Sequence, residues 1–319
     1  MRWIAVFLGA LAALAAEAAA AQDWPSRPVH VVVPYTPGTG ADILSRVLGP
    51  KLSERWKAPV VTDNKPGATG NIGAEQVAQS AADGYTFLLT ATSFVTNPAL
   101  KPAPFDPVKD FQPVALLATG ALGVYVNPQV PAKSMREFIA LVKSQPGKLY
   151  YSSPGNGGPQ HLAMELLKLE TGMNIVHVPY KGAAGAISDL VGGHVQAMIS
   201  ALQTVAPHVH SGRLRMLAVM SAKRAEAFPD VPTLKEQGVA DVEVETWYAM
   251  FAPAGTAEAI VSRVNKDMND FLQERDVRGV LEKQGLNPGG CTPQALGERV
   301  QRELARWTRV VKAAHIEAD

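Results

Sequence analysis

Glycine-rich loops that join a predicted strand to a predicted helix restrict the fold of this chain more than any other sequence feature. One such loop, residues 36–42, follows the β-branched run Val29–Val33 and precedes apolar residues at helical spacing. The same order of strand, loop and helix recurs around the loops 154–161 and 180–185. Strands that alternate with helices in this way indicate an α/β fold, with mostly parallel sheets that helices cover on both faces.

The length of the chain indicates two such α/β units. At 319 residues and 33.9 kDa, the chain exceeds the size that one hydrophobic core usually reaches, so two compact lobes of roughly 100–150 residues are expected. The apolar segment 114–126 is expected to cross between the lobes, and the segments 214–219 and 248–251 are expected to carry the return. The expected division is a signal segment at 1–21, the first part of lobe 1 at 22–122, lobe 2 at 123–225, and the return crossing with the completion of lobe 1 at 226–319.

The N-terminus is typical of a cleaved secretion signal. Met1-Arg2 supplies a positive start, residues 3–16 form an apolar run, and Ala19-Ala20-Ala21 is a small-residue cleavage site. The apolar run of about 14 residues is shorter than the roughly 20 that a membrane-spanning helix needs, so we expect cleavage and not anchoring. The mature protein is therefore expected outside the cytoplasm, without insertion into the membrane.

Charge and cysteine content argue against several classes of protein. The 30 Lys and Arg residues against 29 Asp and Glu give a formal net charge of +1 with no basic run, so no nucleic acid partner is expected. The single cysteine, Cys291, excludes an internal disulfide and a Cys-x-x-Cys pair. His208 and His210 would point to different faces of a helix, so no metal site is expected there.

Motifs for catalysis and cofactor binding are incomplete. The loop that starts at Gly38 begins like a dinucleotide fingerprint, but Ile43 occupies the position of the third glycine, so we expect no cofactor. The sequence contains no Gly-x-Ser-x-Gly elbow, so a serine hydrolase would depend on Ser152 or Ser153 and on a histidine that the sequence does not place. A secreted hydrolase therefore stays a second candidate behind a binding protein.

The glycine loops themselves favour the binding of a small anion. The first turn of a helix has backbone N–H groups without partners inside the helix and carries the positive end of the helix dipole. A glycine loop that enters such a turn forms a socket for an anion, and in open α/β sheets ligands bind at the carboxyl ends of the strands. The alternative is that these glycines serve only tight turns and close helix packing.

Several motifs then resemble the solute receptors of tripartite tricarboxylate transporters, the Bug or TctC family. They follow one another in the same order from residue 24 to the C-terminus. The motifs are residues 24–28 (WPSRP), 34–42 (PYTPGTGAD), 64–74 (NKPGATGNIGA), 83–86 (DGYT), 105–111 (FDPVKDF), 152–157 (SSPGNG), 177–182 (HVPYKG), 247–248 (WY) and 251–256 (FAPAGT).

The resemblance implies a type II-like periplasmic binding protein with a ligand cleft between two lobes. Such a receptor closes on a small organic carboxylate, a di- or tricarboxylate or an aromatic acid, and delivers it to the membrane permease subunits of the transporter. We expect a monomer that is not an enzyme. A receptor that also signals to a sensor protein, instead of or alongside transport, stays a further alternative.

The resemblance also suggests which residues bind the ligand, largely through backbone amides. The first-lobe candidates are Tyr35, Thr39, Gly40, Ala41 and Asp42, and the second-lobe candidates are Gly155, Asn156, Gly157, Gly158 and His161. Asp42 is expected to shape the loop and cap the helix, because a carboxylate repels an anionic ligand. His161 is expected either to donate to a ligand carboxylate or to cap its own loop.

Three positions depart from the pattern of many relatives. Tyr35 occurs where they have Phe, and Ala41 occurs where they have Thr. Ser200 occurs where relatives often have an acidic residue that could face the ligand. Because an amino acid's ammonium group would need such a carboxylate, we expect a ligand without a positive charge.

Overall fold

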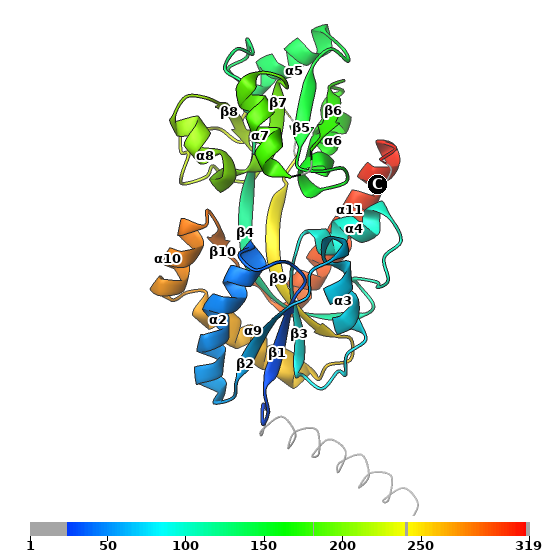
Figure 1. Ribbon diagram of the computed structural model, residues 1–319, viewed down its shortest axis with the longest axis vertical. Helices are drawn as coiled ribbons and strands as arrows, with labels where there is room; N and C mark the ends of the chain where they lie inside the picture. Colours follow the sequence, from blue (N-terminus) through cyan, green and yellow to red (C-terminus); the bar gives the residue numbers. More distant parts are fainter. Residues whose placement is uncertain (1–23, 181, 240–241, 317–319) are drawn as a thin grey trace, which may run out of the picture.

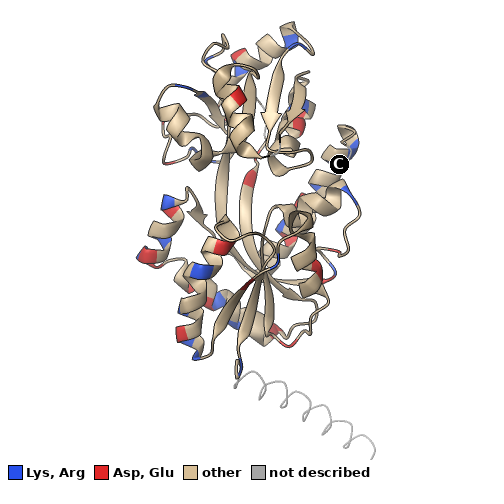
Figure 2. Ribbon diagram, in the orientation of Figure 1, with Lys and Arg blue, Asp and Glu red and all other residues tan. Residues whose placement is uncertain are grey.

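The computed structural model describes residues 24–180, 182–239 and 242–316, and these residues form two lobes joined by two long strands (Figure 1). The expected signal segment, residues 1–21, lies outside the described residues. No helix in the described part of the chain is long and apolar enough to cross a membrane. Figure 2 shows Lys, Arg, Asp and Glu spread over the helices of both lobes.

Both lobes are built from parallel strands that alternate with helices, as the sequence predicts. The first lobe contains β1 (Val29–Val33), α2 (Gly40–Trp56), β2 (Val60–Asn64), the short helix η1 (Ala68–Gly70), α3 (Asn71–Ala78), β3 (Thr86–Ala91) and α4 (Ser93–Leu100). The second lobe contains α5 (Met135–Ser144), β5 (Tyr150–Ser153), α6 (Pro159–Thr171), β6 (Val176–Pro179), α7 (Ala183–Gly192), β7 (Ala197–Ala201), α8 (Leu202–His210) and β8 (Arg215–Val219). The C-terminal part adds α9 (Glu258–Phe271), α10 (Arg275–Lys283), β10 (Asn287–Pro288) and α11 (Pro293–Ala313) to the first lobe.

Two strands, β4 (Phe111–Val126) and β9 (Glu245–Pro253), connect the lobes. In the first lobe β4 pairs with β9 in antiparallel fashion as far as Ala121, and from Leu122 it pairs with β7 of the second lobe. The strand order is β2-β1-β3-β9-β4-β7-β5-β6, so the parallel strands of each lobe are flanked by the antiparallel crossing strands.

The return to the first lobe differs from the prediction. β8 was expected to carry part of the return crossing, but it pairs antiparallel with residues 123–126 of β4 and stays in the second lobe. The return is made by β9 alone, which is longer than the predicted apolar segment 248–251. α10 was not predicted, because its buried face consists of only Val277 and Leu281 in an otherwise charged sequence.

A continuous hydrophobic core runs along the crossing strands from one lobe to the other. One cluster of buried residues includes Val32 and Phe94 of the first lobe together with Phe138 and Leu162 of the second. Trp247 of β9 and Trp307 of α11 belong to the same cluster. This packing fixes the two crossing strands, and through them the ends of the parallel strands beside them.

Candidate functional site

The carboxyl ends of the parallel strands of the two lobes face each other. In the first lobe, Ala91 at the end of β3 pairs with Tyr248, close to the point where β9 enters the lobe. In the second lobe, Ala201 at the end of β7 pairs with Leu122, where β4 enters the lobe. Because β1 and β2 run parallel to β3, and β5 and β6 parallel to β7, the loops after all six strands lie at the junction between the lobes.

The six helices that follow these strands begin at the junction, and their first turns have no side-chain cap. Among the described residues, no side chain caps the start of any of these helices. Their N-cap residues are Thr39 of α2, Gly70 of α3, Thr92 of α4, Gly158 of α6, Gly182 of α7 and Ala201 of α8. In contrast, Ser134 caps α5 as its sequence predicts, by accepting a hydrogen bond from the Glu137 N–H. Uncapped first turns leave N–H groups that can bind an anion.

Asp42 shapes the first-lobe loop. Its carboxylate accepts hydrogen bonds from the Gly38 N–H and the Asn64 side chain, both at 2.9 Å, and from Arg46 Nε at 3.0 Å. Burial alone would raise the pKa of Asp42, but the bonds from Arg46, Gly38 and Asn64 outweigh it and hold the pKa below its usual value. The Asp42 carboxylate is therefore engaged by groups of the protein itself.

The residues next to Asp42 have backbone amides that lie outside the hydrogen-bond ladder of α2. The first amide that bonds within α2 is that of Ile43, which donates to Thr39 O at 2.9 Å, so the amides of residues 40–42 precede the helical ladder. Ala41 is fully buried as a whole residue, side chain and backbone alike. The Thr39 hydroxyl donates to Thr36 O at 3.0 Å and thereby closes the turn before the helix.

Two tyrosines, one from the loop itself and one from β9, contact this loop. The Tyr35 hydroxyl lies 2.6 Å from Ser93 Oγ and 3.0 Å from Thr90 Oγ1, and it accepts a hydrogen bond from the Ala91 N–H. These contacts tie the loop after β1 to the end of β3, while burial raises the pKa of Tyr35. Tyr248 of β9 lies so close to Gly40 that a Cβ atom there would be 2.5 Å from Tyr248 Oη. A side chain at position 40 would therefore displace Tyr248.

The sequence did not indicate Tyr248, Ser93 or Gly70 as site residues. Gly70 lies against the ring of Tyr35, and its φ of +104° favours glycine. The glycine-rich motif 64–74 was the available signal for Gly70. Tyr248 reaches the loop through the pairing of β3 with β9, and Ser93, the first residue of α4, through the pairing of β1 with β3. The sequence reveals neither pairing.

The second-lobe loops are joined to one another by backbone hydrogen bonds. The Tyr180 N–H donates to Ser153 O at 3.0 Å, and the Gly182 N–H donates to Pro154 O at 2.8 Å. Gly155 and Asn156 lie in the same loop, and Gly158 is the N-cap of α6 with Pro159 following it. The predicted residues 155–158 therefore lie at the start of α6, beside the loop that enters α7.

His161 closes its own loop, which is one of the two roles expected for it. Its Nδ1 accepts a hydrogen bond from the Gly157 N–H at 2.9 Å. The ring is nearly buried, with 4% of the residue exposed. The Gly157 amide is therefore occupied by the protein, and this glycine shapes the loop through its φ of +67°.

The two lobes touch at the junction. Gly157 of the second lobe lies against Leu100 at the end of α4, where a Cβ atom would be 2.2 Å from Leu100 Cδ2. Gln203 of α8 lies in the same way against Gly285 of the first lobe. Ser200 of β7 pairs with Gly123 of β4 and is 2% exposed, so it lies beside the crossing strand.

The structure supplies the histidine partner of Ser153 that the sequence did not place. Ser153 Oγ lies 2.7 Å from His177 Nε2. The serine residue is fully buried, however, and its hydroxyl also lies 2.8 Å from Gly155 O. A nucleophile must be exposed to substrate, so this Ser-His contact holds the loop together and does not form a hydrolase site.

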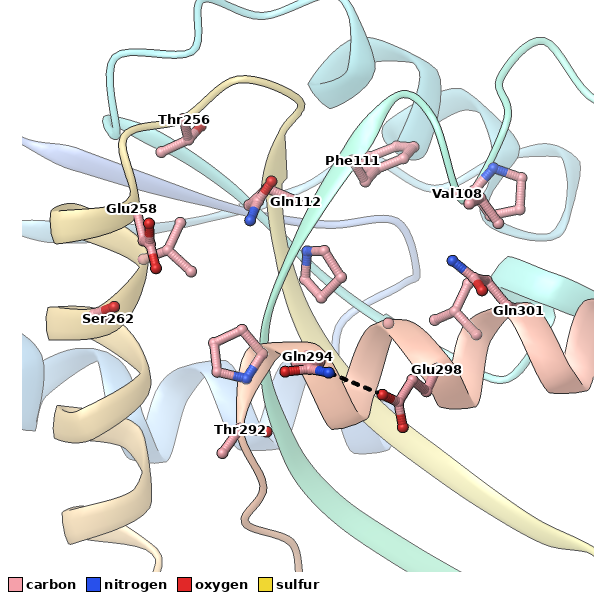
Figure 3. A pocket seen from close by; sticks show the side chains of 16 residues that line it. Val108, Phe111, Gln112, Thr256, Glu258, Ser262, Thr292, Gln294, Glu298 and Gln301 are labelled. Carbon is pink, nitrogen blue, oxygen red and sulfur yellow. Dashed lines mark hydrogen bonds between the residues drawn. The ribbon is translucent and has the colours of Figure 1, made fainter.

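A groove of 760 Å³ lies on the first lobe, away from these loops (Figure 3). Its walls come from the start of β4, the start of α9 and the first turns of α11, and include Gln112, Glu258 and Glu298. Gln294 donates to Glu298 at 3.1 Å along one wall. The predicted binding residues and this groove are therefore separate features. Among the described residues, no group of three His, Cys, Asp or Glu side chains could hold a metal ion.

Comparison with known proteins identifies the family. The model of the tripartite tricarboxylate transporter family receptor, TctC, matches residues 44–316. The chain belongs to the TctC family. It is similar to the protein BugT of Bordetella pertussis, with 36% identity over 312 residues that cover 97% of this chain and 95% of BugT.

Solved structures of TctC and Bug proteins have the same two-lobed fold. R. palustris Rpa4515 with adipate is 36% identical with a TM-score of 0.76, and it covers 92% of this chain and 99% of its own. MatC from Rhodopseudomonas palustris with bound malate is 31% identical with a TM-score of 0.73, over 90% of this chain and 100% of its own. A TctC solute binding protein from Polaromonas, without ligand, is 31% identical with a TM-score of 0.82, over 91% and 99%. The fold expected from the sequence, that of a periplasmic binding protein, is confirmed.

Proposed function

We propose that the protein is a periplasmic receptor that closes its two lobes on a small organic acid without a positive charge and delivers it to the permease subunits of a tripartite transporter. The observation that carries this proposal is the set of six helices that begin at the junction between the lobes without a side-chain cap. An anion held between them gains hydrogen bonds from both lobes only when the lobes are closed. Closure is then driven by contacts that the open form lacks.

The main-chain amides of the two loops would hold the carboxylate groups. In the first lobe these are the amides of Gly40, Ala41 and Asp42, and Tyr248 Oη lies beside Gly40. In the second lobe they belong to Gly158 and to the first turn of α6, with Gly155 and Asn156 lining the loop. Hydrogen bonds to an ionised carboxylate are stronger than those to neutral groups, so a few such contacts suffice for recognition.

A dicarboxylate is the favoured ligand class. Adipate and malate, which occur in the names of two similar structures, both have two carboxylates. Ser200 provides no negative charge for an ammonium group, and Asp42 is already engaged by Gly38, Asn64 and Arg46. The proposed site therefore favours dicarboxylates over amino acids such as aspartate.

A thermal-shift screen of the chain from residue 22 against about a hundred organic acids and amino acids tests the proposal. A ligand that binds only the native state stabilises it by about 2.7 kcal/mol at a hundredfold excess over Kd, which corresponds to several degrees in Tm. Dicarboxylates should raise Tm, and aspartate and glutamate should not. A flat profile for ligand-free protein would contradict the carboxylate receptor, and hits confined to amino acids would contradict the ligand class.

A further inference from the structure

Two histidines of the second lobe stack on each other directly behind the glycine loop. His161 of α6 and His177 of β6 have ring centroids 3.7 Å apart and an interplanar angle of 14°. The Tyr151 ring of β5 lies beside this pair, with its centroid 4.9 Å from that of His177 and 6.3 Å from that of His161. The three rings form a cluster next to residues 153–157.

Each histidine holds a different part of the loop. His161 Nδ1 accepts a hydrogen bond from the Gly157 N–H at 2.9 Å. His177 Nε2 lies 2.7 Å from the Ser153 hydroxyl, which in turn contacts Gly155 O at 2.8 Å. The two imidazoles thus support both ends of the loop that leads into α6.

The contact with Gly157 determines the protonation state of His161. A backbone N–H can only donate, so His161 Nδ1 must be an unprotonated acceptor and the neutral ring must carry its proton on Nε2. Protonation of Nδ1 would place two N–H groups opposite each other and remove the support of Gly157. A positive charge on both stacked rings would add repulsion at 3.7 Å.

Tyr151, Glu165 and Lys168 are described titratable groups that lie near the two rings. The Tyr151 hydroxyl donates to Glu165 Oε1 at 2.6 Å, and Lys168 Nζ lies 2.7 Å from the same oxygen. Glu165 Oε1 is 3.9 Å from His161 Nε2, too far for a direct hydrogen bond. Glu165 Oε1 is therefore in contact with both Tyr151 and Lys168. On the other side of the ring, His161 Nδ1 accepts the hydrogen bond from the Gly157 N–H.

We propose that His161 and His177 are positioning residues for the second-lobe loop, and that the loop keeps its binding conformation only while His161 Nδ1 is unprotonated. The consequence for ligand affinity rests on the proposed function. Affinity is present above the pH at which His161 gains its second proton and is lost as the pH falls through that titration.

The first test needs no ligand. Heteronuclear NMR of the imidazole nitrogens in ligand-free protein near pH 7.5 reports which nitrogen carries the proton. We expect His161 with the proton on Nε2 only, and a change of the Gly157 amide resonance with the same midpoint as the His161 ring on acidification. A proton on Nδ1 near pH 7.5, or a Gly157 resonance unaffected by the titration of His161, would overturn the proposal.

The second test measures the affinity for adipate near pH 7.5 and near pH 5.5 by calorimetry. His161→Asn retains an acceptor near the Nδ1 position but does not titrate, whereas His161→Leu removes the acceptor. The exposed residue His194 provides the control His194→Asn. All four proteins experience the same protonation of adipate itself.

Between the two pH values, the wild type and His194→Asn should lose at least tenfold more affinity than His161→Asn. His161→Leu should bind at least tenfold more weakly than the wild type near pH 7.5. An equal pH dependence of the wild type and His161→Asn would overturn the proposal. If adipate does not bind the wild type at all, the ligand assignment fails, and the NMR experiment decides the role of His161 on its own.

Discussion

The Asp42 carboxylate accepts a hydrogen bond from the Gly38 N–H at 2.9 Å, across the loop that joins β1 to α2. This bond closes the loop over the start of α2. The carboxylate that makes it has the same sign of charge as the proposed ligand. The charge is compensated by Arg46 Nε at 3.0 Å and by the Asn64 amide. The loop is thus shaped by a carboxylate and presents main-chain amides.

Asp42→Asn should lower stability in a pH-dependent way. Replacing a buried charged acceptor should cost about 1.5–3 kcal/mol near neutral pH, measured by urea unfolding. Because the folded pKa of Asp42 lies below its usual value, the stabilisation is present above the unfolded pKa of about 3.9 and is lost as the pH falls through the folded pKa. The difference between wild type and variant should therefore shrink below about pH 4.

Asp83→Asn is the matched control for this substitution. Asp83 pairs with Arg27 at 2.7 Å, but both side chains are exposed, so its loss should be smaller and should weaken with added salt. An equal effect of the two substitutions would contradict the structural role of Asp42.

Gly40→Ala should weaken ligand binding by displacing Tyr248. The added Cβ would lie 2.5 Å from Tyr248 Oη, so the tyrosine or the start of α2 must move, and we expect at least a tenfold rise in Kd by calorimetry. Gly49→Ala in the same helix meets nothing nearer than 3.9 Å. This control should stabilise the protein by about 0.5–1 kcal/mol and leave Kd unchanged. Unchanged affinity in Gly40→Ala would exclude the start of α2 from the site.

Ser153→Ala distinguishes a receptor from a hydrolase. The wild type should show no turnover of model esters above background, because Ser153 is fully buried and its hydroxyl supports Gly155. The variant should bind ligand more weakly, since the contact between the loop and His177 is lost. Ester turnover that disappears in Ser153→Ala would contradict the receptor and establish the second candidate.

Ser200→Asp should reduce the preference for dicarboxylates. A carboxylate beside the crossing strand would repel a dianion and attract an ammonium group. The ratio of aspartate to malate affinity should rise at least tenfold in competition calorimetry. An unchanged ratio would show that Ser200 does not set the charge of the ligand.

Local patterns in the sequence predicted those parts of the fold that depend on local structure. β1 spans Val29–Val33 as its β-branched run indicates, and Ser134 caps α5 as its spacing with Glu137 indicates. The strand ends also lie where glycine and proline interrupt the apolar runs. These features need only neighbouring residues, so the sequence contains enough information for them.

The parts that the sequence did not predict depend on pairing between distant segments. Tyr248 reaches Gly40 because β9 pairs with β3, and His177 reaches Ser153 because β6 pairs with β5. β8 stays in the second lobe because it pairs antiparallel with the second-lobe part of β4. A single sequence gives the strands but does not specify which edges they share.

The most direct measurement of the central claim is an NMR titration of the backbone amides with the acid that gives the largest thermal shift. The account predicts that the amides of residues 40–42 in the first lobe and of residues 158, 160 and 161 in the second shift together with one midpoint. Shifts confined to one lobe, or to the groove around Gln112 and Glu298, would contradict a carboxylate held between facing helix N-termini.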